Sequence, residues 1–448
     1  MVKKLIVAKF GGTSVANFNA MNRSADLIVN NSNIRLIVLS ASATITNILI
    51  ALSVVNTNKI YRSSLIGKIS DIQNSILNHF DKQNKLHKSI DHMIANIAIL
   101  AENASKVSSV ELKDEIVSYG ELMSSMIFVE ILRQKRANVD WFDVRNVMKT
   151  NNNFGCAKPN INIISEKVKK YLEPLLLKKI IVTQGFIGRE DQGRTTTLGR
   201  GGSDYTAALL GEALKAKCIE IWTDVPGIYT TDPRLVPTAK RIDEITFKEA
   251  AEMASFGAKI LHPSTLLPAV RSDIPVFVSS SQKPEAGGTY ISNKTKIIPL
   301  LRALSLLKKQ TLLTFNDLKY NKTKFLANVF NILSNYNLPV DIIISDKSNI
   351  SLIINNSDTS INEPINNSLL VKLETFCNVT IRENLSLIAV IGNNLTKVNG
   401  ITKMLFATLE PFNLNMICYG ASDHNISFLV QSIDAENIIR ILHKNFFE

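Results

Sequence analysis

The 448-residue sequence lacks several features that would assign it to a specialised class at once. No run approaches the ~20 consecutive apolar residues that a membrane-spanning helix needs. The four cysteines are scattered and include no Cys-x-x-Cys pair, which argues against a metal site or a disulfide framework and favours a reducing compartment. The apolar run near the start is broken by Lys9, and no small-residue cleavage site follows it. We therefore expect a cytoplasmic protein.

The sequence also lacks the common motifs for binding nucleotides or nucleic acids. It contains no Gly-x-x-x-x-Gly-Lys-Ser/Thr, and the segment "GRGGSD" does not fit Gly-x-Gly-x-x-Gly. The formal net charge of +12 suggests a nucleic-acid partner, but the lysines are spread along the chain, without a basic arm or zinc-finger pattern. Lys is abundant together with Asn and Ile, as A/T-rich codons would produce. We therefore expect no nucleic-acid partner.

Short apolar strands alternate with helical patterns through the first two-thirds of the chain. This alternation predicts a largely parallel sheet covered by helices on both faces, with ligands beyond the carboxyl ends of the strands. The predicted strands lie at 5–8, 34–43, 139–144, 178–188, 218–225 and 274–281. The predicted helices include 46–55, 111–136, 204–216 and 247–260.

From about residue 295 the pattern changes to two passes of strand–helix–strand–strand–helix–strand. Each pass is typical of a small ferredoxin-like unit. The exposed sheet edges of such units pair readily, so they suggest a dimer interface or a ligand-binding regulatory module. We therefore predict three domains, at 1–294, 295–384 and 385–448.

Four segments that follow core elements look suited to binding phosphate. The first is Lys9 with Gly11 and Gly12, where Thr13 or Ser14 is expected to cap a helix. The second places Arg200 and two glycines before a helix with Asp204 in its first turn. The others are "WTDVPGIYTTDPR" and "FGAKILHP". Each alone is most simply a cap, a turn or a surface cation, but together they indicate phosphoryl transfer.

These segments, read as "KFGGTSV", "GRGGSDYTA", "WTDVPGIYTTDPR" and "FGAKILHP", resemble the amino-acid kinase family, specifically the aspartokinases. The resemblance extends over essentially the whole chain, to "MICYGASDHNISFLV" near its end. It is greatest to the lysine-sensitive class III enzymes of enteric bacteria. The family implies an amino-acid kinase α/β fold over 1–294, followed by two ferredoxin-like ACT modules through which a homodimer or a tetramer forms.

The resemblance implies transfer of phosphate from ATP to the side chain of L-aspartate, giving ADP and 4-phospho-L-aspartate. This reaction begins the biosynthesis of lysine, threonine, methionine and diaminopimelate. The aspartate side chain, with a pKa of about 3.9, is already an anionic nucleophile at pH 7, so no general base is needed. The enzyme must hold two repelling anions together, which requires cations, backbone donors and Mg²⁺. We expect Mg²⁺ to be carried mainly by the phosphates, without protein metal ligands.

The family match also assigns roles to individual residues. Lys9 is expected to stabilise the transferring phosphate, and Asp204 to organise the lysines and the loop. Arg200 is expected to pair with the α-carboxylate of aspartate, and Glu121 to accept its ammonium group. The expected aspartate site comprises Ser40, Thr46, Glu121, Arg200, Gly201, Gly202 and Ser203. The expected nucleotide site comprises Lys9, Phe10, Gly11, Gly12, Thr223, Asp224, Tyr229, Arg234, Lys259 and Ile260.

The sequence departs from the family where the effector L-lysine is expected to bind. The expected site comprises Lys324, Phe325, Leu326, Val340, Asp341, Ser345, Asp346 and Lys347. Lys324 replaces a glycine of the family's Gly-Phe-Leu turn, and Ser345-Asp346-Lys347 replaces Thr-Ser-Glu. A longer side chain and a reversed charge near the effector's ammonium groups predict weakened lysine inhibition.

Two alternatives stay open at this point. One is another carboxylate kinase of the same fold, such as glutamate or acetylglutamate kinase, against which the paired C-terminal modules and "GELMS" argue. The other is an inactive amino-acid sensor that keeps the fold, against which the complete set of phosphate-handling residues argues.

Overall fold

The computed structural model describes residues 5–258, 263–316, 322–336, 338, 340–346, 349–355, 365 and 367–448. They form two compact units, and the chain passes between them more than once. Unit 1 contains the described residues within Met1–Ile228, Arg241–Ala251 and Lys259–Lys296. Unit 2 contains those within Tyr229–Lys240, Glu252–Ala258 and Ile297–Glu448.

Unit 1 is built on an eight-stranded sheet with the order β10-β12-β11-β7-β1-β2-β4-β3. Every neighbouring pair is parallel except β11 with β12, so the predicted mostly parallel sheet is confirmed. The strands are β1 (Ile6–Phe10), β2 (Ile34–Leu39), β3 (Val139–Phe142), β4 (Ile180–Gln184), β7 (Cys218–Thr223), β10 (Glu244–Thr246), β11 (Val276–Ser280) and β12 (Gly288–Ser292). The central strands are apolar on both faces because both faces are covered.

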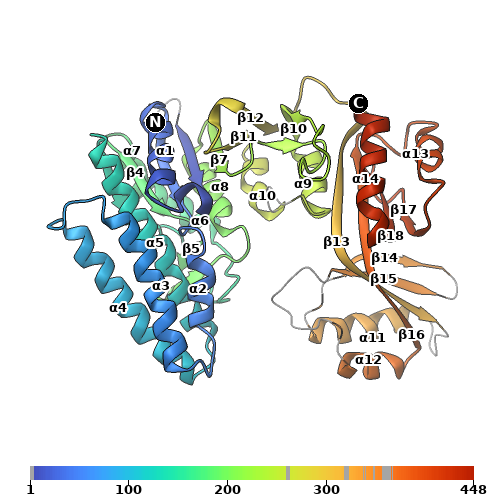
Figure 1. The fold of residues 1–448 in the computed structure, drawn as a ribbon, viewed down its shortest axis with the longest axis horizontal. Helices are drawn as coiled ribbons and strands as arrows, with labels where there is room; N and C mark the ends of the chain where they lie inside the picture. Colours follow the sequence, from blue (N-terminus) through green and yellow to red (C-terminus); the bar gives the residue numbers. More distant parts are fainter. Residues whose placement is uncertain are drawn as a thin grey trace. The chain divides into compact units, whose positions relative to one another are not determined.

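Helices cover the two faces of this sheet (Figure 1). On one face α1 and α5 pack on the strands with α2, α3 and α4 outside them, and on the other face α8 packs beside α6 and α10. The helices are α1 (Phe18–Val29), α2 (Ile45–Leu52), α3 (Lys59–Leu77), α4 (Lys85–Lys106), α5 (Val110–Gln134), α6 (Ile161–Lys167), α7 (Glu173–Leu176), α8 (Gly202–Leu214), α9 (Phe247–Ser255) and α10 (Pro263–Arg271). The remaining short strands are β5 (Ile187–Arg189), β6 (Thr195–Thr197), β8 (Ile228–Tyr229) and β9 (Arg241–Ile242).

The turn after β1 differs from the expectation that Thr13 or Ser14 caps the next helix. The chain first makes a short 3₁₀ turn, and α1 begins later with Asn17 as its cap, whose side chain accepts the N–H of Ala20 at 2.9 Å. Ser14 is buried, and its Oγ lies 2.6 Å from Oγ of Ser281. The predicted cap is wrong because a partner distant in sequence engages the hydroxyl.

Unit 2 contains a six-stranded sheet with the order β14-β15-β13-β16-β18-β17, in which every pair is antiparallel. Helices α11 and α12 pack on one half of the sheet, and α13 and α14 pack on the other half (Figure 1). The elements are β13 (Leu301–Asn316), α11 (Lys322–Asn335), β14 (Val340–Ser345), β15 (Ile350–Asn355), α12 (Asn367–Glu374), β16 (Asn378–Gly392), α13 (Ile401–Leu409), β17 (Leu414–Cys418), β18 (Asn425–Gln431) and α14 (Ser432–Phe447).

Two long strands are shared between the halves of unit 2. The second half of β13 pairs with β15 and with the first half of β16. The first half of β13 pairs with the second half of β16, which in turn pairs with β18. The two modules are thus interleaved rather than strictly consecutive along the chain. The domain limits at residues 294 and 384 stay a prediction, and residue 384 lies within β16.

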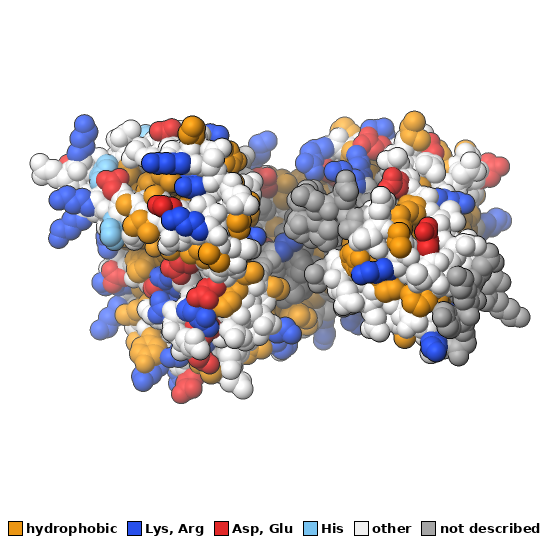
Figure 2. All heavy atoms as spheres, turned by 90° about the horizontal axis from the view of Figure 1, so that it is seen from below, with side chains coloured by type: hydrophobic (Ala, Val, Ile, Leu, Met, Phe, Trp, Pro, Cys, Tyr) orange, Lys and Arg blue, Asp and Glu red, His pale blue; other side chains and the backbone are white. Residues whose placement is uncertain are grey.

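The surface carries mixed charge. On the face drawn in Figure 2, the described Lys and Arg side chains alternate with Asp, Glu and hydrophobic side chains and form no continuous basic stripe. The four cysteines are free thiols. Within the described ranges, no helix has both the length and the apolar character to cross a bilayer.

Candidate active site

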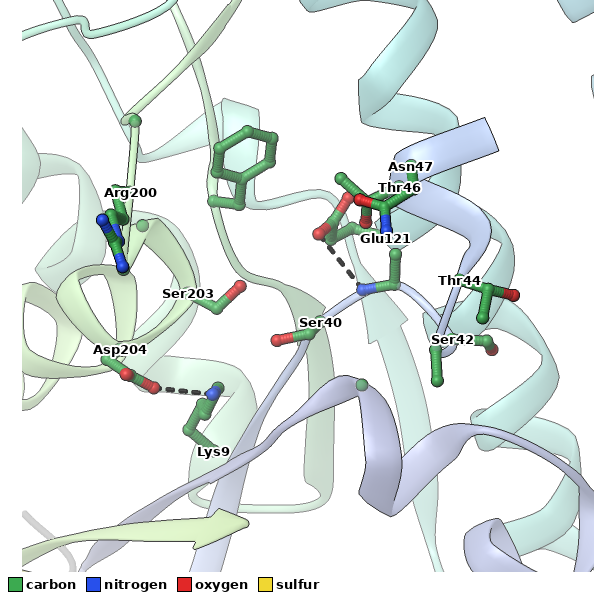
Figure 3. Close-up of a pocket in the computed structure, with 17 residues that line it drawn as sticks. Lys9, Ser40, Ser42, Thr44, Thr46, Asn47, Glu121, Arg200, Ser203 and Asp204 are labelled. Carbon is green, nitrogen blue, oxygen red and sulfur yellow. Dashed lines mark hydrogen bonds and ion pairs between the residues drawn. The ribbon is translucent and has the colours of Figure 1, made fainter. Parts of the chain in front are cut away.

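A cavity of about 430 Å³ opens in unit 1 beyond the carboxyl ends of β1 and β2. The N-terminal turn of α8, the middle of α5 and the start of α2 form its other walls (Figure 3). The lining residues are Lys9, Gly12, Ser40, Ala41, Ser42, Ala43, Thr44, Thr46, Asn47, Glu121, Phe186, Gly199, Arg200, Gly201, Gly202, Ser203 and Asp204. The cavity therefore brings together all the residues predicted for the aspartate site, together with both predicted catalytic residues.

Lys9 and Asp204 form an ion pair within this cavity. The distance from Lys9 Nζ to Asp204 Oδ1 is 2.7 Å, and the two side chains are only 11% and 15% exposed (Figure 3). Lys9 comes from β1, the fifth strand in the sheet order, and Asp204 from the first turn of α8. The pair thus holds a cation at the edge of the sheet where the cavity opens.

Glu121 presents an unpartnered carboxylate oxygen on the opposite side of the cavity. Its Oε1 accepts the N–H of Ala41 at 3.1 Å, whereas its buried Oε2 has no hydrogen-bond partner among the described residues. Burial raises the pKa of Glu121 to about 8, although the Ala41 hydrogen bond opposes the rise. A buried carboxyl with one unpaired oxygen is suited to a cationic ligand group, because an unpaired buried polar atom is otherwise costly.

Glycines allow the backbone to approach closely at two edges of the cavity. Gly201 caps α8 with φ 70°, a left-handed conformation that other residues rarely adopt. At Gly12 a Cβ would lie 2.9 Å from the carbonyl oxygen of Ala41, so a side chain would push the two loops apart. With Asp204 in the first turn of α8, the loop presents Arg200 and a helix N-terminus to the same space.

The residues predicted for the nucleotide site are distributed over several parts of the chain. Thr223 ends β7 in unit 1, and its Oγ1 donates to Asp224 Oδ1 at 3.0 Å. Tyr229 and Arg234 lie in the part of the chain that belongs to unit 2, where Arg234 pairs with Asp232 at 2.7 Å. Phe10 is fully buried, and Gly11 donates its N–H to the Trp222 carbonyl at 3.0 Å. Lys259 and Ile260 lie outside the described residues.

The residues predicted for the effector site lie in the first half of the unit 2 sheet. Lys324 and Leu326 are in the first turns of α11, while Phe325 is fully buried and packs edge-on against Phe315. Val340, Asp341 and Ser345 belong to β14. Asp346 follows them, and its Oδ1 accepts the N–H of Asn349 at 2.7 Å while its carbonyl accepts Lys322 Nζ. Lys347 lies outside the described residues.

Four polar or aromatic residues that line the cavity were not predicted from the sequence, which are Ser42, Thr44, Asn47 and Phe186. Asp114, a buried carboxylate one heptad before Glu121 on α5, was not predicted either. Residues seven positions apart lie on the same face of a helix, so the spacing of Asp114 and Glu121 could have predicted that both face the cavity side of α5.

Asp114 fastens the segments behind the Arg200 loop. Its Oδ2 accepts the backbone N–H groups of Gly155 and Thr197, each at 2.8 Å, and its Oδ1 accepts Thr197 Oγ1 at 2.8 Å. Burial raises the pKa of Asp114, and these hydrogen bonds oppose the rise. Thr197 precedes Gly199 by two residues, and the carbonyl of Gly155 lies near Gly199. Asp114 therefore fixes the entry to the loop that carries Arg200.

Among the residues that the structure describes, no group of three or more His, Cys, Asp and Glu side chains is arranged to hold a metal ion. The acidic residue nearest to Lys9 is already engaged in the ion pair.

The chain matches known proteins over its whole length. Residues 4–280 match the amino acid kinase family, and residues 388–446 match the ACT domain. The chain is 53% identical to the lysine-sensitive aspartokinase 3 of Escherichia coli, with 100% of both chains covered. It is 31% identical to the chloroplastic aspartokinase 1 of Arabidopsis thaliana, covering 99% of this chain and 80% of that protein.

Solved structures give the same result. The crystal structure of E. coli aspartokinase III in complex with aspartate and ADP matches with a TM-score of 0.90 and 53% identity, covering 99% of this chain and 100% of that one. The complex of the same enzyme with lysine and aspartate matches with a TM-score of 0.86. The chain belongs to the amino acid kinase family and is an aspartokinase. The expected fold class, an amino-acid kinase domain with ferredoxin-like ACT modules, is confirmed.

In this aspartokinase we predict that Asp114→Ala raises KM for aspartate by about tenfold while KM for ATP changes less than twofold. Each buried N–H that loses its acceptor costs about 1–3 kcal/mol, which frees the loop carrying Arg200. Asp114→Asn is the matched variant, because its amide oxygen can still accept both N–H groups and Thr197 Oγ1 can accept from its NH₂. Steady-state kinetics that show equal effects of Ala and Asn, or an effect on kcat alone, would contradict this role.

Proposed function

We propose that this aspartokinase transfers the γ-phosphoryl group of ATP to the side-chain carboxylate of L-aspartate through the cavity around Lys9. The observation that carries the proposal is that one cavity holds a paired lysine, an unpartnered buried glutamate oxygen and an arginine beside a helix N-terminus. These groups match the charges of an amino acid with two carboxylates that meets a triphosphate. The E. coli relative crystallised with aspartate and ADP supports the same reading.

In the proposed complex each charged group of aspartate has a partner of opposite sign. The ammonium lies against Glu121 Oε2, and the α-carboxylate pairs with the planar guanidinium of Arg200. The side-chain carboxylate then points toward Lys9, where its oxygen attacks the phosphorus. Ser40, Thr46 and Ser203 supply hydroxyl groups around the substrate, and Gly202 supplies a backbone N–H at the start of α8.

Lys9 performs its proposed role by neutralising charge as it develops on the transferring phosphoryl group. Asp204 holds the ammonium group in position and takes no proton, since the nucleophile is already ionised at neutral pH. We propose that Gly11 and Gly12 contribute backbone donors, and that the residues predicted for ATP, including Lys259, hold the nucleotide. Mg²⁺ is proposed to accompany the phosphates, where it would shield their negative charge.

The same resemblance supports proposals about the setting of the enzyme. Phospho-aspartate production places it at the start of amino-acid biosynthesis leading to lysine, threonine and methionine. We propose a cytoplasmic homodimer or tetramer assembled through the ACT modules, supported by four free thiols and by the edge strands β14 and β17.

An assay of ADP release with purified protein tests the proposed reaction. We expect ADP release that depends on L-aspartate and a hydroxamate-trapped acyl phosphate as product. L-glutamate and N-acetylglutamate serve as comparison substrates, and turnover of either in place of aspartate would establish the alternative carboxylate kinase. Amino-acid binding without ADP release would establish an inactive sensor.

We also propose that L-lysine inhibits this enzyme more weakly than it inhibits the lysine-sensitive E. coli relative. Lys324 occupies the first turn of α11 where the family has glycine, and Lys347 replaces a glutamate. The acid nearest in sequence, Asp346, is engaged by Asn349 and does not stand free as a substitute anion. Like charge near the effector's ammonium groups lowers affinity for a cationic amino acid.

The first prediction from this proposal is that Lys9→Ala and Asp204→Ala each lower kcat by about 10²–10³-fold with the fold intact. Lys9→Ala removes the positive charge that stabilises the phosphoryl group, and Asp204→Ala removes the carboxylate that holds that charge in position. Lys135→Ala is the control, because Lys135 forms a 2.6 Å surface pair with Asp26 in the same unit. Turnover like that of the unmodified enzyme in either cavity variant would contradict the assigned roles.

A second prediction concerns pH. Glu121, with a pKa of about 8, is mostly protonated below that pH, whereas the substrate's ammonium favours the ionised carboxylate. We expect kcat/KM for aspartate to rise with pH and to level off above about pH 8. Glu121→Gln should flatten this dependence and lower kcat/KM by about 10–100-fold, with ADP affinity nearly normal. A collapse of ADP affinity would make Glu121 structural or nucleotide-facing.

A third prediction concerns inhibition by lysine, measured as the concentration that halves activity in parallel assays with the E. coli enzyme. We expect at least a tenfold higher value for this chain. The double variant Lys324→Gly/Lys347→Glu should lower this concentration toward that of the relative. The glycine restores room for the effector at the start of α11, and the glutamate restores a negative charge near its ammonium groups. Equal inhibition of the two enzymes would show that the sequence changes are harmless.

A further inference from the structure

The segment 229–240 begins with the last residue of β8 and ends just before β9. It belongs to unit 2 and packs into the core of that unit. Val236 is 5% exposed and packs in the same hydrophobic cluster as residues of β16, β18 and α14. Leu235 and Ala239 pack against this cluster as well. A segment that carries two residues predicted to bind nucleotide thus shares the core of the second ACT module.

Four polar contacts also fasten this segment to the C-terminal part of α14. Thr230 Oγ1 lies 2.9 Å from His443 Nε2, and Arg440 Nε donates to the Leu235 carbonyl at 3.2 Å. The other two join Lys240 Nζ to the Phe447 carbonyl at 2.6 Å and Thr238 Oγ1 to Glu448 Oε1. The contacts are spread over the whole segment, so α14 holds it along its length.

Thr230 is the most highly connected of these residues. Its N–H donates to the Lys240 carbonyl at 2.9 Å, and its carbonyl accepts the N–H of Leu304 in β13 at 2.7 Å. Its Oγ1 accepts the N–H of Lys240 at 3.0 Å and also forms the hydrogen bond with His443 Nε2. Every polar group of Thr230 is therefore committed.

His443 is fully buried and oriented from its other side. Its Nδ1 lies 3.2 Å from Glu448 Oε1, and its ring stacks on Phe447 with centroids 5.2 Å apart. A carboxylate only accepts hydrogen bonds, so Nδ1 carries the proton that faces Glu448, and Nε2 is the ring atom that hydrogen-bonds with the Thr230 hydroxyl. The imidazole is thus held by a hydrogen-bond partner at each of its two ring nitrogens.

We infer that His443 is a positioning residue for the nucleotide, which holds Tyr229 and Arg234 in their binding conformation through Thr230 and the segment 229–240. This inference rests on the proposed nucleotide roles of Tyr229 and Arg234. Tyr229 is the direct neighbour of Thr230, so a change in the Thr230–His443 hydrogen bond moves the backbone that carries it. The affinity for ATP therefore depends in part on α14 of unit 2.

Point variants of the full-length enzyme test the inference. His443→Phe removes the Thr230–His443 hydrogen bond, and Thr230→Val removes it together with the hydrogen bond from the Lys240 N–H. For each variant we expect about a tenfold higher KM for ATP and a matching loss of ADP affinity by calorimetry. KM for aspartate should change less than twofold. Thr230→Ser keeps the hydroxyl and should restore the affinity. Asn445→Ala is the control, because Asn445 on α14 contacts Thr408 of α13 instead.

Each remaining outcome also decides the question. Equal changes in both KM values, or a lower Tm with unchanged ADP affinity, would overturn the inference and leave His443 a purely structural residue. If the buried variants do not fold, the double variant Lys240→Ala/Glu448→Ala removes the Lys240–Phe447 and Thr238–Glu448 contacts at exposed residues. Unchanged ADP affinity there would overturn the inference as well. Failure of aspartate-dependent ADP release by the unmodified enzyme would instead overturn the proposed function, while ADP calorimetry would still test the role of His443.

Discussion

The active cavity depends on a lysine held at the edge of the unit 1 sheet by one carboxylate. An ammonium group that is nine-tenths buried is costly to desolvate unless an anion accompanies it. Asp204 supplies that anion at 2.7 Å, and it does so from the first turn of α8. The end of β1 and the start of α8 must therefore meet, which fixes α8 against the sheet and places its N-terminus at the cavity. Because the cost of desolvation offsets the attraction between the two charges, the ion pair adds little to the stability of the fold. Its contribution is to hold the charge of Lys9 in position at the cavity.

Helix α5 provides the second constraint, because one rigid element orients three separate loops. Asp114 holds Gly155 and Thr197, Glu121 holds Ala41, and Ser124 donates to the carbonyl of Ser40 at 2.8 Å. These contacts fall along a single buried stretch of the helix. The proposed aspartate pocket is consequently positioned by side chains that a regular helix spaces, which is more precise than mutual contact between loops.

The sequence predicted the parts of this arrangement that depend on local chemistry. Apolar strands ending in glycine and hydroxyl residues correctly indicated the carboxyl edge of a parallel sheet, and the loop from Arg200 to Asp204 was correctly placed at a helix start. Ser14 was misjudged because its partner Ser281 lies 267 positions away, and no local pattern reports such a pairing. The sharing of β13 between both modules has the same cause, since pairing between distant strands is decided by tertiary packing.

The interleaving of unit 2 has a consequence for regulation. Residues 229–240 are packed with β16, β18 and α14, while β13 accepts neighbours from both modules. A ligand that alters the packing of either module therefore acts on β13 or α14, which residues 229–240 contact through Leu304 and His443. These residues include Tyr229 and Arg234, which are proposed to bind the nucleotide. Such coupling requires that the ligand bind two arrangements of unit 2 with different affinity. Coupling between two binding sites is also reciprocal, so ATP would change the affinity for that ligand by the same factor. The proposed loss of lysine affinity through Lys324 would leave these contacts between the ACT sheet and residues 229–240 unchanged.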